Sequence, residues 1–214
     1  MKTSAIILAG GFSKRFGQDK CLIELAGKPL ILHVLDKVSK IVNESLVVVS
    51  SEDQRDTYTS SVSSETKVII DKYSPRSPIV GALTGFENAF GEYSLLLPCD
   101  TPFVSKEIVS LLLDLCINRS AVIPRWPNRY IEPLHAVYHT KSALTASKTA
   151  YEEKKLDLRS MIANLRGVRY ISTLVLQQLD PKLTTFFNVN TLGDLKKAES
   201  MLKRLNTYSF SLSE

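Results

Sequence analysis

The sequence has few cysteines and no long hydrophobic run. Its three cysteines, Cys21, Cys99 and Cys116, are an odd number at wide spacings, which argues against a disulfide framework and against Cys-x-x-Cys zinc or redox sites. No stretch approaches the roughly 18 apolar residues of a membrane span, and only Lys2 precedes the short N-terminal apolar run, which glycines soon end. We therefore expect a soluble, unexported protein of the reducing cytoplasm, with no membrane partner.

Positive charge is in excess but is not gathered in one block. The formal net charge is +5, which suits anionic ligands. Aromatic and basic residues do not interleave as they do on surfaces that bind single-stranded nucleic acid. The clearest basic cluster, Lys196-Lys197 with Lys203-Arg204, falls on a segment of helical pattern, where a solvated helix face is the simpler explanation. We therefore expect no nucleic-acid partner.

Apolar runs of strand length alternate with longer segments of helical period along the chain. This alternation is the pattern of an α/β domain with a mostly parallel sheet. At 214 residues the chain fits one domain, which we assign to residues 1–206, followed by a C-terminal tail at 207–214. The predicted strands are Ser4–Leu8, Ser45–Ser50, Lys67–Ile70, Tyr93–Leu97, Ala121–Pro124, Leu134–Tyr138 and Arg169–Ile171, and the predicted helices include Pro29–Val38, Ile79–Phe90 and Lys106–Leu115.

A glycine-rich segment, residues 8–20, follows the first predicted strand directly. Its glycines let the backbone adopt positive φ angles and approach a bulky anion, with successive N–H groups turned toward the anion's oxygens. Arg15 can contact a phosphate through two parallel hydrogen bonds, and Lys20 adds a compact charge. These features favour a nucleoside triphosphate as ligand, with an ordinary solvated strand-to-helix connection as the alternative.

The spacing of this segment excludes two common phosphate-binding motifs. A Walker A loop has Gly-Lys-Ser/Thr at its end, whereas Gly17 is followed here by Gln18. A dinucleotide-binding fingerprint has Gly-x-Gly-x-x-Gly, whereas Gly10 and Gly11 are adjacent. The segment therefore represents a third kind of loop.

Asp100 is the second strong signal. It lies between Pro98 and Pro102 just after a predicted buried strand, at the edge of a parallel sheet where ligands collect. Mg²⁺ prefers hard oxygen ligands and usually takes one or two carboxylates together with phosphate oxygens and water. Asp100 could instead cap the following helix, but Ser105, with Glu107 close by, is the better cap. We therefore expect Asp100 to bind a metal ion.

Polar side chains also follow two other extended segments. Asp71 ends the predicted strand Lys67–Ile70, where its carboxylate could accept hydrogen bonds from a guanine edge or ribose hydroxyls, or could simply shape the turn. Asn188 and Asn190 lie on one side of an extended segment before the last helix, which Asn190 or Thr191 could also cap. The residues alone leave these alternatives open.

Other candidate metal ligands and nucleophiles form no competing site. His135 and His139 fall on a predicted strand, where their spacing separates them by about 13 Å, too far for one ion. Cys99 follows a buried strand, where an inert core thiol is the expected role, and no base lies beside it in the sequence.

Four motifs occur in a fixed order along the chain: Leu8-Ala9-Gly10-Gly11 with Arg15, Gly17 and Lys20; Gly27-Lys28-Pro29-Leu30; Pro98-Cys99-Asp100-Thr101-Pro102; and Asn188-Val189-Asn190-Thr191. Together they resemble the molybdenum cofactor guanylyltransferases, a branch of the nucleotidyltransferases. Several ordered motifs are far more specific than one glycine loop. The resemblance covers nearly the whole chain and implies a Rossmann-like three-layer sandwich. It also implies an enzyme that transfers GMP from GTP to molybdopterin with Mg²⁺ and releases pyrophosphate.

The resemblance also implies a role for each matching residue. GTP contacts would fall to Leu8, Ala9, Gly10, Gly11, Lys20 and Asp71, the metal ion to Asp100, and the acceptor side to Asn188 and Asn190. Arg15, Lys20 and Asp100 are the expected catalytic residues, because they would neutralise the charge that grows on the leaving pyrophosphate. The implied partners are GTP, molybdopterin and molybdenum-cofactor delivery proteins.

The chain departs from the family pattern at two positions. Ser50 stands where the family often has asparagine, and Ser77 replaces the first glycine of a Gly-Pro-Leu-x-Gly motif. Gly10 agrees with the guanylyl branch, because relatives that transfer CMP tend to carry Leu-Ala-Ala-Gly. Two alternatives stay open: a nucleotidyltransferase that uses CTP or another acceptor, such as a sugar phosphate or coenzyme precursor, and a noncatalytic nucleotide-binding adaptor.

Overall fold

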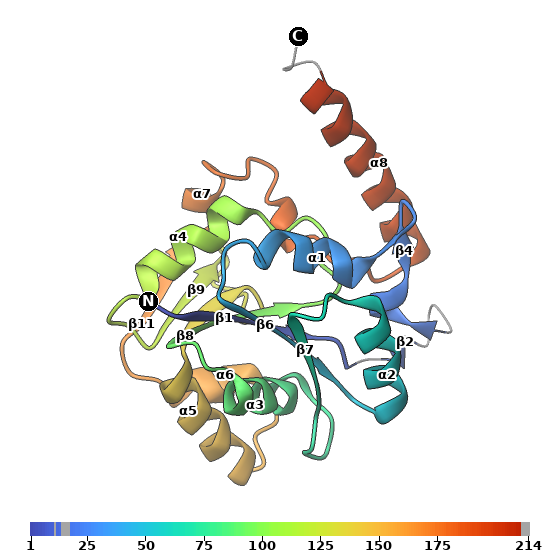
Figure 1. The fold of residues 1–214 in the computed structure, drawn as a ribbon. Coiled ribbons are helices and arrows are strands. Elements are labelled where there is room, and N and C mark those ends of the chain that lie inside the picture. The colour runs from blue at the N-terminus through green and yellow to red at the C-terminus, as the bar shows by residue number, and fades with distance from the viewer. Residues whose placement is uncertain (11, 14–17, 211–214) are drawn as a thin grey trace.

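The computed structural model describes residues 1–10, 12–13 and 18–210, and its core is a mostly parallel sheet (Figure 1). Within this part of the chain the sheet contains seven strands, in the order β11 (Val168–Ser172), β9 (Ala121–Arg125), β10 (Ala136–His139), β8 (Tyr93–Pro98), β1 (Thr3–Leu8), β6 (Glu44–Val49) and β7 (Thr66–Ile70). Only β10 runs antiparallel to its neighbours. Two short ribbons pair β2 (Phe12–Ser13) with β3 (Gln18–Asp19) and β4 (Glu24–Leu25) with β5 (Lys28–Pro29).

Helices cover both faces of the sheet, so the fold is the predicted three-layer α/β sandwich (Figure 1). One face carries α1 (Leu30–Val38), α4 (Lys106–Cys116) and α7 (Thr173–Leu176), and the other carries α3 (Pro78–Asn88), α5 (Thr140–Glu152) and α6 (Leu158–Ala163). The remaining elements are α2 (Glu52–Ser61), α8 (Leu192–Phe210) and the short 3₁₀ helices η1 (Lys20–Leu22) and η2 (Thr184–Phe186).

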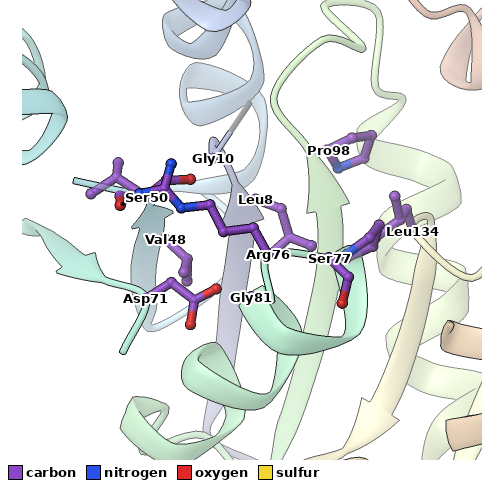
Figure 2. A pocket seen from close by; sticks show the side chains of 12 residues that line it. Leu8, Gly10, Val48, Ser50, Asp71, Arg76, Ser77, Gly81, Pro98 and Leu134 are labelled. Atoms are coloured by element: carbon purple, nitrogen blue, oxygen red, sulfur yellow. Dashed lines mark hydrogen bonds between the residues drawn. The ribbon is translucent and has the colours of Figure 1, made fainter. Parts of the chain in front are cut away.

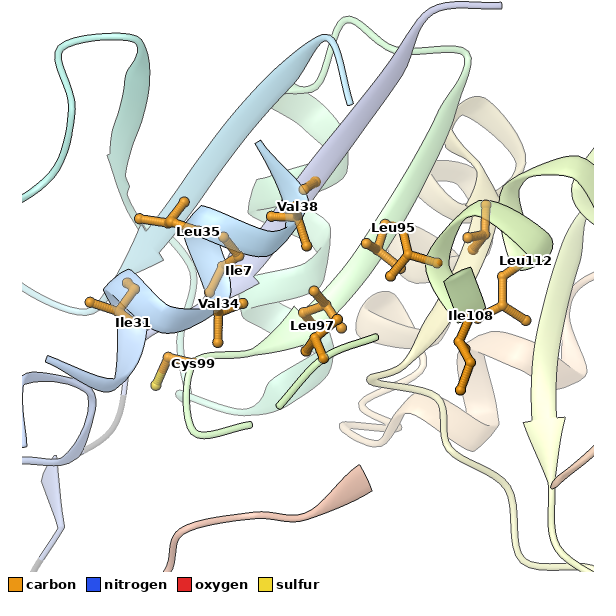
Figure 3. Packing of buried hydrophobic residues seen from close by; sticks show 14 of the residues in the cluster. Ile7, Ile31, Val34, Leu35, Val38, Leu95, Leu97, Cys99, Ile108 and Leu112 are labelled. Carbon is orange, nitrogen blue, oxygen red and sulfur yellow. The ribbon is translucent and has the colours of Figure 1, made fainter. Parts of the chain in front are cut away.

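The sheet is apolar on both faces because successive side chains of a strand point to opposite sides. On β1, Ala5 and Ile7 belong to the core under α1 and α4, whereas Ile6 belongs to the core under α3 and α5. Figure 3 shows the first of these cores, in which Val34 of α1 packs near Ile7 and the side chains of β8. The near-continuous apolar runs of the predicted strands therefore reflect burial from both sides.

Helix α3 lies very close to β1. A Cβ atom on Gly85 would stand only 2.3 Å from Cγ2 of Ile6, so glycine is needed where the helix meets the strand. This close packing places the N-terminus of α3, beginning at Pro78, at the carboxyl edge of the sheet. The polar residues predicted to bind ligands follow strands at the same edge.

All seven predicted strands are confirmed, with ends that differ by at most a few residues. Helix α3 ends at Asn88 rather than at Phe90. Helix α8 runs to Phe210, so the first four residues of the predicted tail are helical, and 211–214 lie outside the described residues. No helix in the described ranges is long and apolar enough to cross a membrane.

The expectation of no disulfide was wrong. Cys21 and Cys99 form one, with their Cα atoms 5.5 Å apart, although 78 residues separate them in the chain. Cys21 lies in η1 and Cys99 directly follows β8, and both side chains are buried in the core under α1. Wide spacing along the chain does not exclude a disulfide, because the tertiary fold brings η1 next to the loop that follows β8. Cys116 is free and buried, and burial raises the pKa of its thiol to about 12.

Candidate functional site

Three segments that are far apart in the sequence meet beyond the carboxyl end of β8. Lys20 Nζ donates hydrogen bonds to Asp100 Oδ2 and to Asn190 Oδ1. The Lys20 and Asp100 side chains are 18% and 12% exposed, so water screens their ion pair only partly. The Val189 N–H donates to the Asp100 carbonyl oxygen at 2.9 Å, which ties the C-terminal segment to this strand end. The structure thus joins three predicted residues from three different motifs.

The segment that carries Lys20 is anchored on both sides. Asp19 Oδ1 caps η1 by accepting a hydrogen bond from the Cys21 N–H at 3.0 Å, and it also accepts one from the Tyr58 hydroxyl at 2.9 Å. Burial, reinforced by the charge of Asp19, raises the pKa of Tyr58, which therefore remains a proton donor. The disulfide from Cys21 to Cys99 links this segment covalently to the loop after β8.

Asp100 does not cap the helix that follows it. As predicted, Ser105 caps α4: its Oγ accepts a hydrogen bond from the Ile108 N–H at 3.2 Å and donates to Glu107 Oε2 at 2.7 Å. Asp100 Oδ1 is buried and has no hydrogen-bond partner among the described residues. A buried polar atom without a partner is costly. Its presence at a strand end indicates a position prepared for a ligand, and a cation suits a carboxylate oxygen.

A cavity of about 290 Å³ opens at the carboxyl ends of β1, β6 and β7 (Figure 2). Leu8 and Gly10 line it at the end of β1, and Asp71 lines it after β7. Asp71 Oδ1 accepts hydrogen bonds from Thr84 Oγ1 at 2.7 Å and from the Tyr73 N–H at 3.2 Å. Asp71 Oδ2 has no such bond within the described part of the chain. Asp71 therefore shapes the following turn with one oxygen and leaves the other open.

Two other contacts define the mouth of this cavity. A Cβ atom on Gly10 would stand 2.3 Å from Ser50 Oγ, so a larger residue in the first loop would displace the Ser50 hydroxyl. Arg76 also lines the cavity, and its Nη2 donates to the Ser50 carbonyl oxygen at 2.5 Å. Arg76 is not predicted by the sequence motifs, because an exposed loop residue belongs to no periodic pattern. The only available signal was a basic residue between Asp71 and Pro78.

A second cavity, of about 370 Å³, adjoins the first and shares Pro98 with it. Asn188 lines this second cavity together with Glu132 and His135. Burial lowers the pKa of His135 to about 3, so its imidazole is neutral at physiological pH. Burial also raises the pKa of Glu132, an effect that the hydrogen bond from Trp126 partly opposes. The sequence pattern predicted Asn188 at the site but not the half-buried Glu132 and the buried His135 beside it.

Two groups of predicted residues remain, together with the histidine pair that was expected to form no site. Gly11 and Arg15 lie outside the described residues. Ala9 is only 1% exposed and lines neither cavity. His135 and His139 do not share a site, because His139 caps α5 with its side chain.

The profile of one family, the MobA-like NTP transferase domain, matches residues 5–168. The chain belongs to this family. It is accordingly a nucleotidyltransferase, and its Rossmann-like fold and family resemblance are confirmed. The MobA-like chain is 34% identical over 204 residues to a probable molybdenum cofactor guanylyltransferase of Pyrococcus horikoshii, with 91% of this chain and 98% of that protein covered. A protein of the same name from Methanosarcina acetivorans is 33% identical, with 93% and 89% covered.

Solved structures give the same result for the fold. The molybdopterin-guanine dinucleotide biosynthesis protein A of Archaeoglobus fulgidus superposes with a TM-score of 0.80 at 30% identity, with 94% of this chain and 99% of that chain covered. A 4-diphosphocytidyl-2C-methyl-D-erythritol synthase of Anaerococcus prevotii superposes with a TM-score of 0.70 at 15% identity, with 94% and 96% covered. At that identity the second likeness concerns the fold alone.

Proposed function

We propose that this protein transfers GMP from GTP to the terminal phosphate of molybdopterin, with Mg²⁺, and releases pyrophosphate. The observation that carries the proposal is the cluster of Lys20, Asp100 and Asn190 beside two adjoining cavities. One cavity has the size for a base and a largely apolar lining that carries the polar groups of Asp71 and Arg76, and the other offers room for an acceptor. The names of the full-length relatives support the choice of substrates.

In this proposal the first cavity holds guanine. The open Oδ2 of Asp71 would accept hydrogen bonds from the N1–H and amino group of the base, while Oδ1 stays bound to Thr84. Leu8 provides apolar contact at the end of β1, and the backbone at Gly10 approaches the nucleotide closely. Asn188, on the wall of the second cavity, would contact the acceptor.

The residues present fit a magnesium ion. Asp100 Oδ1 is buried without a partner in the described structure, and a carboxylate oxygen is a ligand that Mg²⁺ prefers. No group of three or more His, Cys, Asp or Glu side chains that could hold a metal occurs among the described residues, so the substrate phosphates would supply further ligands. The bound ion would act as a Lewis acid that stabilises negative charge on the phosphates.

The reaction would require little covalent chemistry from the protein. An oxygen of the acceptor phosphate attacks the α-phosphorus of GTP, the bond from that phosphorus to the bridging oxygen breaks, and pyrophosphate leaves with the electron pair. The protein must hold two anions that repel each other in line for attack. Lys20 would leave its apo contact with Asn190 to bind the departing phosphates, and Arg15 would assist from the glycine-rich segment.

The test supplies purified protein with Mg²⁺ and molybdopterin, and offers GTP, CTP, ATP and UTP separately. We expect pyrophosphate and a nucleotidylated pterin with GTP, and much less product with the other three. A control without molybdopterin should release no pyrophosphate. Preference for CTP would overturn the choice of base, a requirement for a sugar phosphate would overturn the acceptor, and binding of GTP without any turnover would indicate an adaptor.

A further inference from the structure

We propose that Arg76 selects guanine by donating hydrogen bonds to O6 and N7 of the base while Asp71 binds the opposite, hydrogen-donating part of its edge. This inference rests on the proposed function, because it assumes that the first cavity holds the base of GTP. It adds a specificity-determining residue that the sequence motifs do not contain. Ser50 and Ser77, the two departures from the family pattern, line the same cavity.

One cavity carries both a hydrogen-bond acceptor, Asp71, and a cationic donor, Arg76. Asp71 is held after β7 by its hydrogen bonds to Thr84 and Tyr73, and its Oδ2 remains open. Arg76 is exposed and lines the same cavity. In Figure 2 its side chain runs across the cavity from the Ser77 side toward Ser50, above the Asp71 carboxylate in that view.

Arg76 has more N–H groups than its recorded contact uses. A guanidinium has five, in a planar fork, and the described structure records one hydrogen bond from it, from Nη2 to the Ser50 carbonyl oxygen at 2.5 Å. No ion pair between Arg76 and an acidic side chain occurs among the described residues. The bond to Ser50 keeps the fork over the cavity and leaves its other donors free for a ligand.

The donors of Arg76 and the acceptor of Asp71 are complementary to the edge of guanine. Guanine presents O6 and N7 as adjacent acceptors, the pattern to which arginine binds with two hydrogen bonds. Adenine presents an amino donor at the position of O6, so Arg76 would meet a donor there instead of an acceptor. The Asp71 carboxylate can accept hydrogen bonds from the N1–H and the 2-amino group of guanine, and adenine has neither of these donors. The pair Asp71 and Arg76 therefore selects guanine by attraction and adenine by repulsion.

The experiment measures equilibrium dissociation constants of wild type, Arg76→Ala and Arg76→Lys for GTP, 7-deaza-GTP, ITP and ATP in the presence of Mg²⁺. The control variant is Arg119→Ala, because Arg119 is exposed and lines neither cavity. We expect Arg76→Ala to weaken GTP binding by about tenfold to a hundredfold, the range for one bidentate contact to guanine. Arg76→Lys should recover only part of the loss because it lacks the fork.

The base analogues separate recognition of guanine from a general effect. ITP keeps O6 and N7, so Arg76→Ala should cost the same factor with ITP as with GTP. 7-Deaza-GTP lacks the N7 acceptor, so it should bind wild type more weakly and lose less on the substitution. The affinity for ATP should be unchanged or higher in Arg76→Ala.

The outcomes distinguish the two proposals. If wild type binds GTP selectively but Arg76→Ala weakens all four nucleotides equally, Arg76 contacts phosphate or ribose and the inference is wrong while the proposed function stands. Unchanged binding of GTP by Arg76→Ala would also overturn the inference, because Arg76 would then contribute nothing to nucleotide binding. If wild type binds none of the guanine nucleotides, the proposed function itself fails. Thermal denaturation of each variant confirms that the exposed substitutions leave the fold intact.

Discussion

The two edges of the central sheet each carry a buried carboxylate, and the two differ in how their oxygens are used. At the amino edge, Glu44 Oε2 accepts hydrogen bonds from Ser4 Oγ at 2.6 Å and from the Phe90 N–H at 3.0 Å. Glu44 Oε1 accepts from Lys67 Nζ at 2.7 Å. At the carboxyl edge, Asp100 is similarly buried, yet its Oδ1 has no partner in the described ranges.

This difference separates a structural carboxylate from one that is open to a ligand. The oxygens of Glu44 satisfy backbone and side-chain donors that burial would otherwise leave unpaired, so Glu44 stabilises the fold. Asp100 carries an unsatisfied oxygen at the edge where ligands bind in parallel sheets. Burial alone therefore does not distinguish the two carboxylates, whereas the open acceptor makes Asp100 the candidate ligand-binding acid.

The largest expected effect concerns Asp100. Asp100→Ala should lower the rate of GMP transfer by more than about a hundredfold, because it removes the carboxylate that pairs with Lys20 and is proposed to bind the metal ion. The thermal midpoint should stay near that of wild type, since Lys20 keeps its contact with Asn190. Steady-state kinetics and scanning calorimetry measure the two quantities. Near-normal turnover in this variant would refute the metal assignment.

Glu44→Ala should lower stability and leave turnover unchanged, the reverse of Asp100→Ala. Loss of the carboxylate leaves the Ser4 hydroxyl and the Phe90 N–H without their acceptor, so the free energy of unfolding should fall by about 2 to 3 kcal/mol. Transfer by the folded enzyme, measured well below its melting temperature, should be unchanged. Urea denaturation gives the stability. A large loss of turnover without loss of stability would break the contrast between the two edges.

A smaller effect is expected from the two lysines that pair with these carboxylates. Lys20→Ala should weaken GTP binding and slow transfer by about tenfold each, because a charged hydrogen-bond donor to phosphate is removed. Lys67→Ala is the matched control: its side chain is 59% exposed but its partner Glu44 is only 3% exposed, so its loss should cost about 1 to 2 kcal/mol of stability and leave GTP affinity unchanged. Calorimetric titration with GTP measures binding. Unchanged GTP affinity in Lys20→Ala would count against its place on the triphosphate.

Much of the fold and part of the candidate site could be predicted from local signals. The buried strands appear as short apolar runs, and Ser105 is recognisable as a cap, which left Asp100 without that structural role. Arg76 could not be predicted, because its position over the cavity depends on the path of an irregular loop between β7 and α3. The Cys21–Cys99 pair was missed for a related reason, since spacing along the chain says little about proximity across a sheet.

The sequence by itself determined the order of strands and helices, the motifs and the family, because hydrophobic periodicity, capping and turn chemistry act over a few residues. Only the tertiary structure decided which motifs meet. Lys20 lies 80 residues from Asp100 and 170 residues from Asn190 in the chain. They come together because β8 pairs directly with β1 and Val189 hydrogen-bonds to Asp100. Such contacts depend on which strands lie side by side in the sheet, and no local sequence pattern encodes that arrangement.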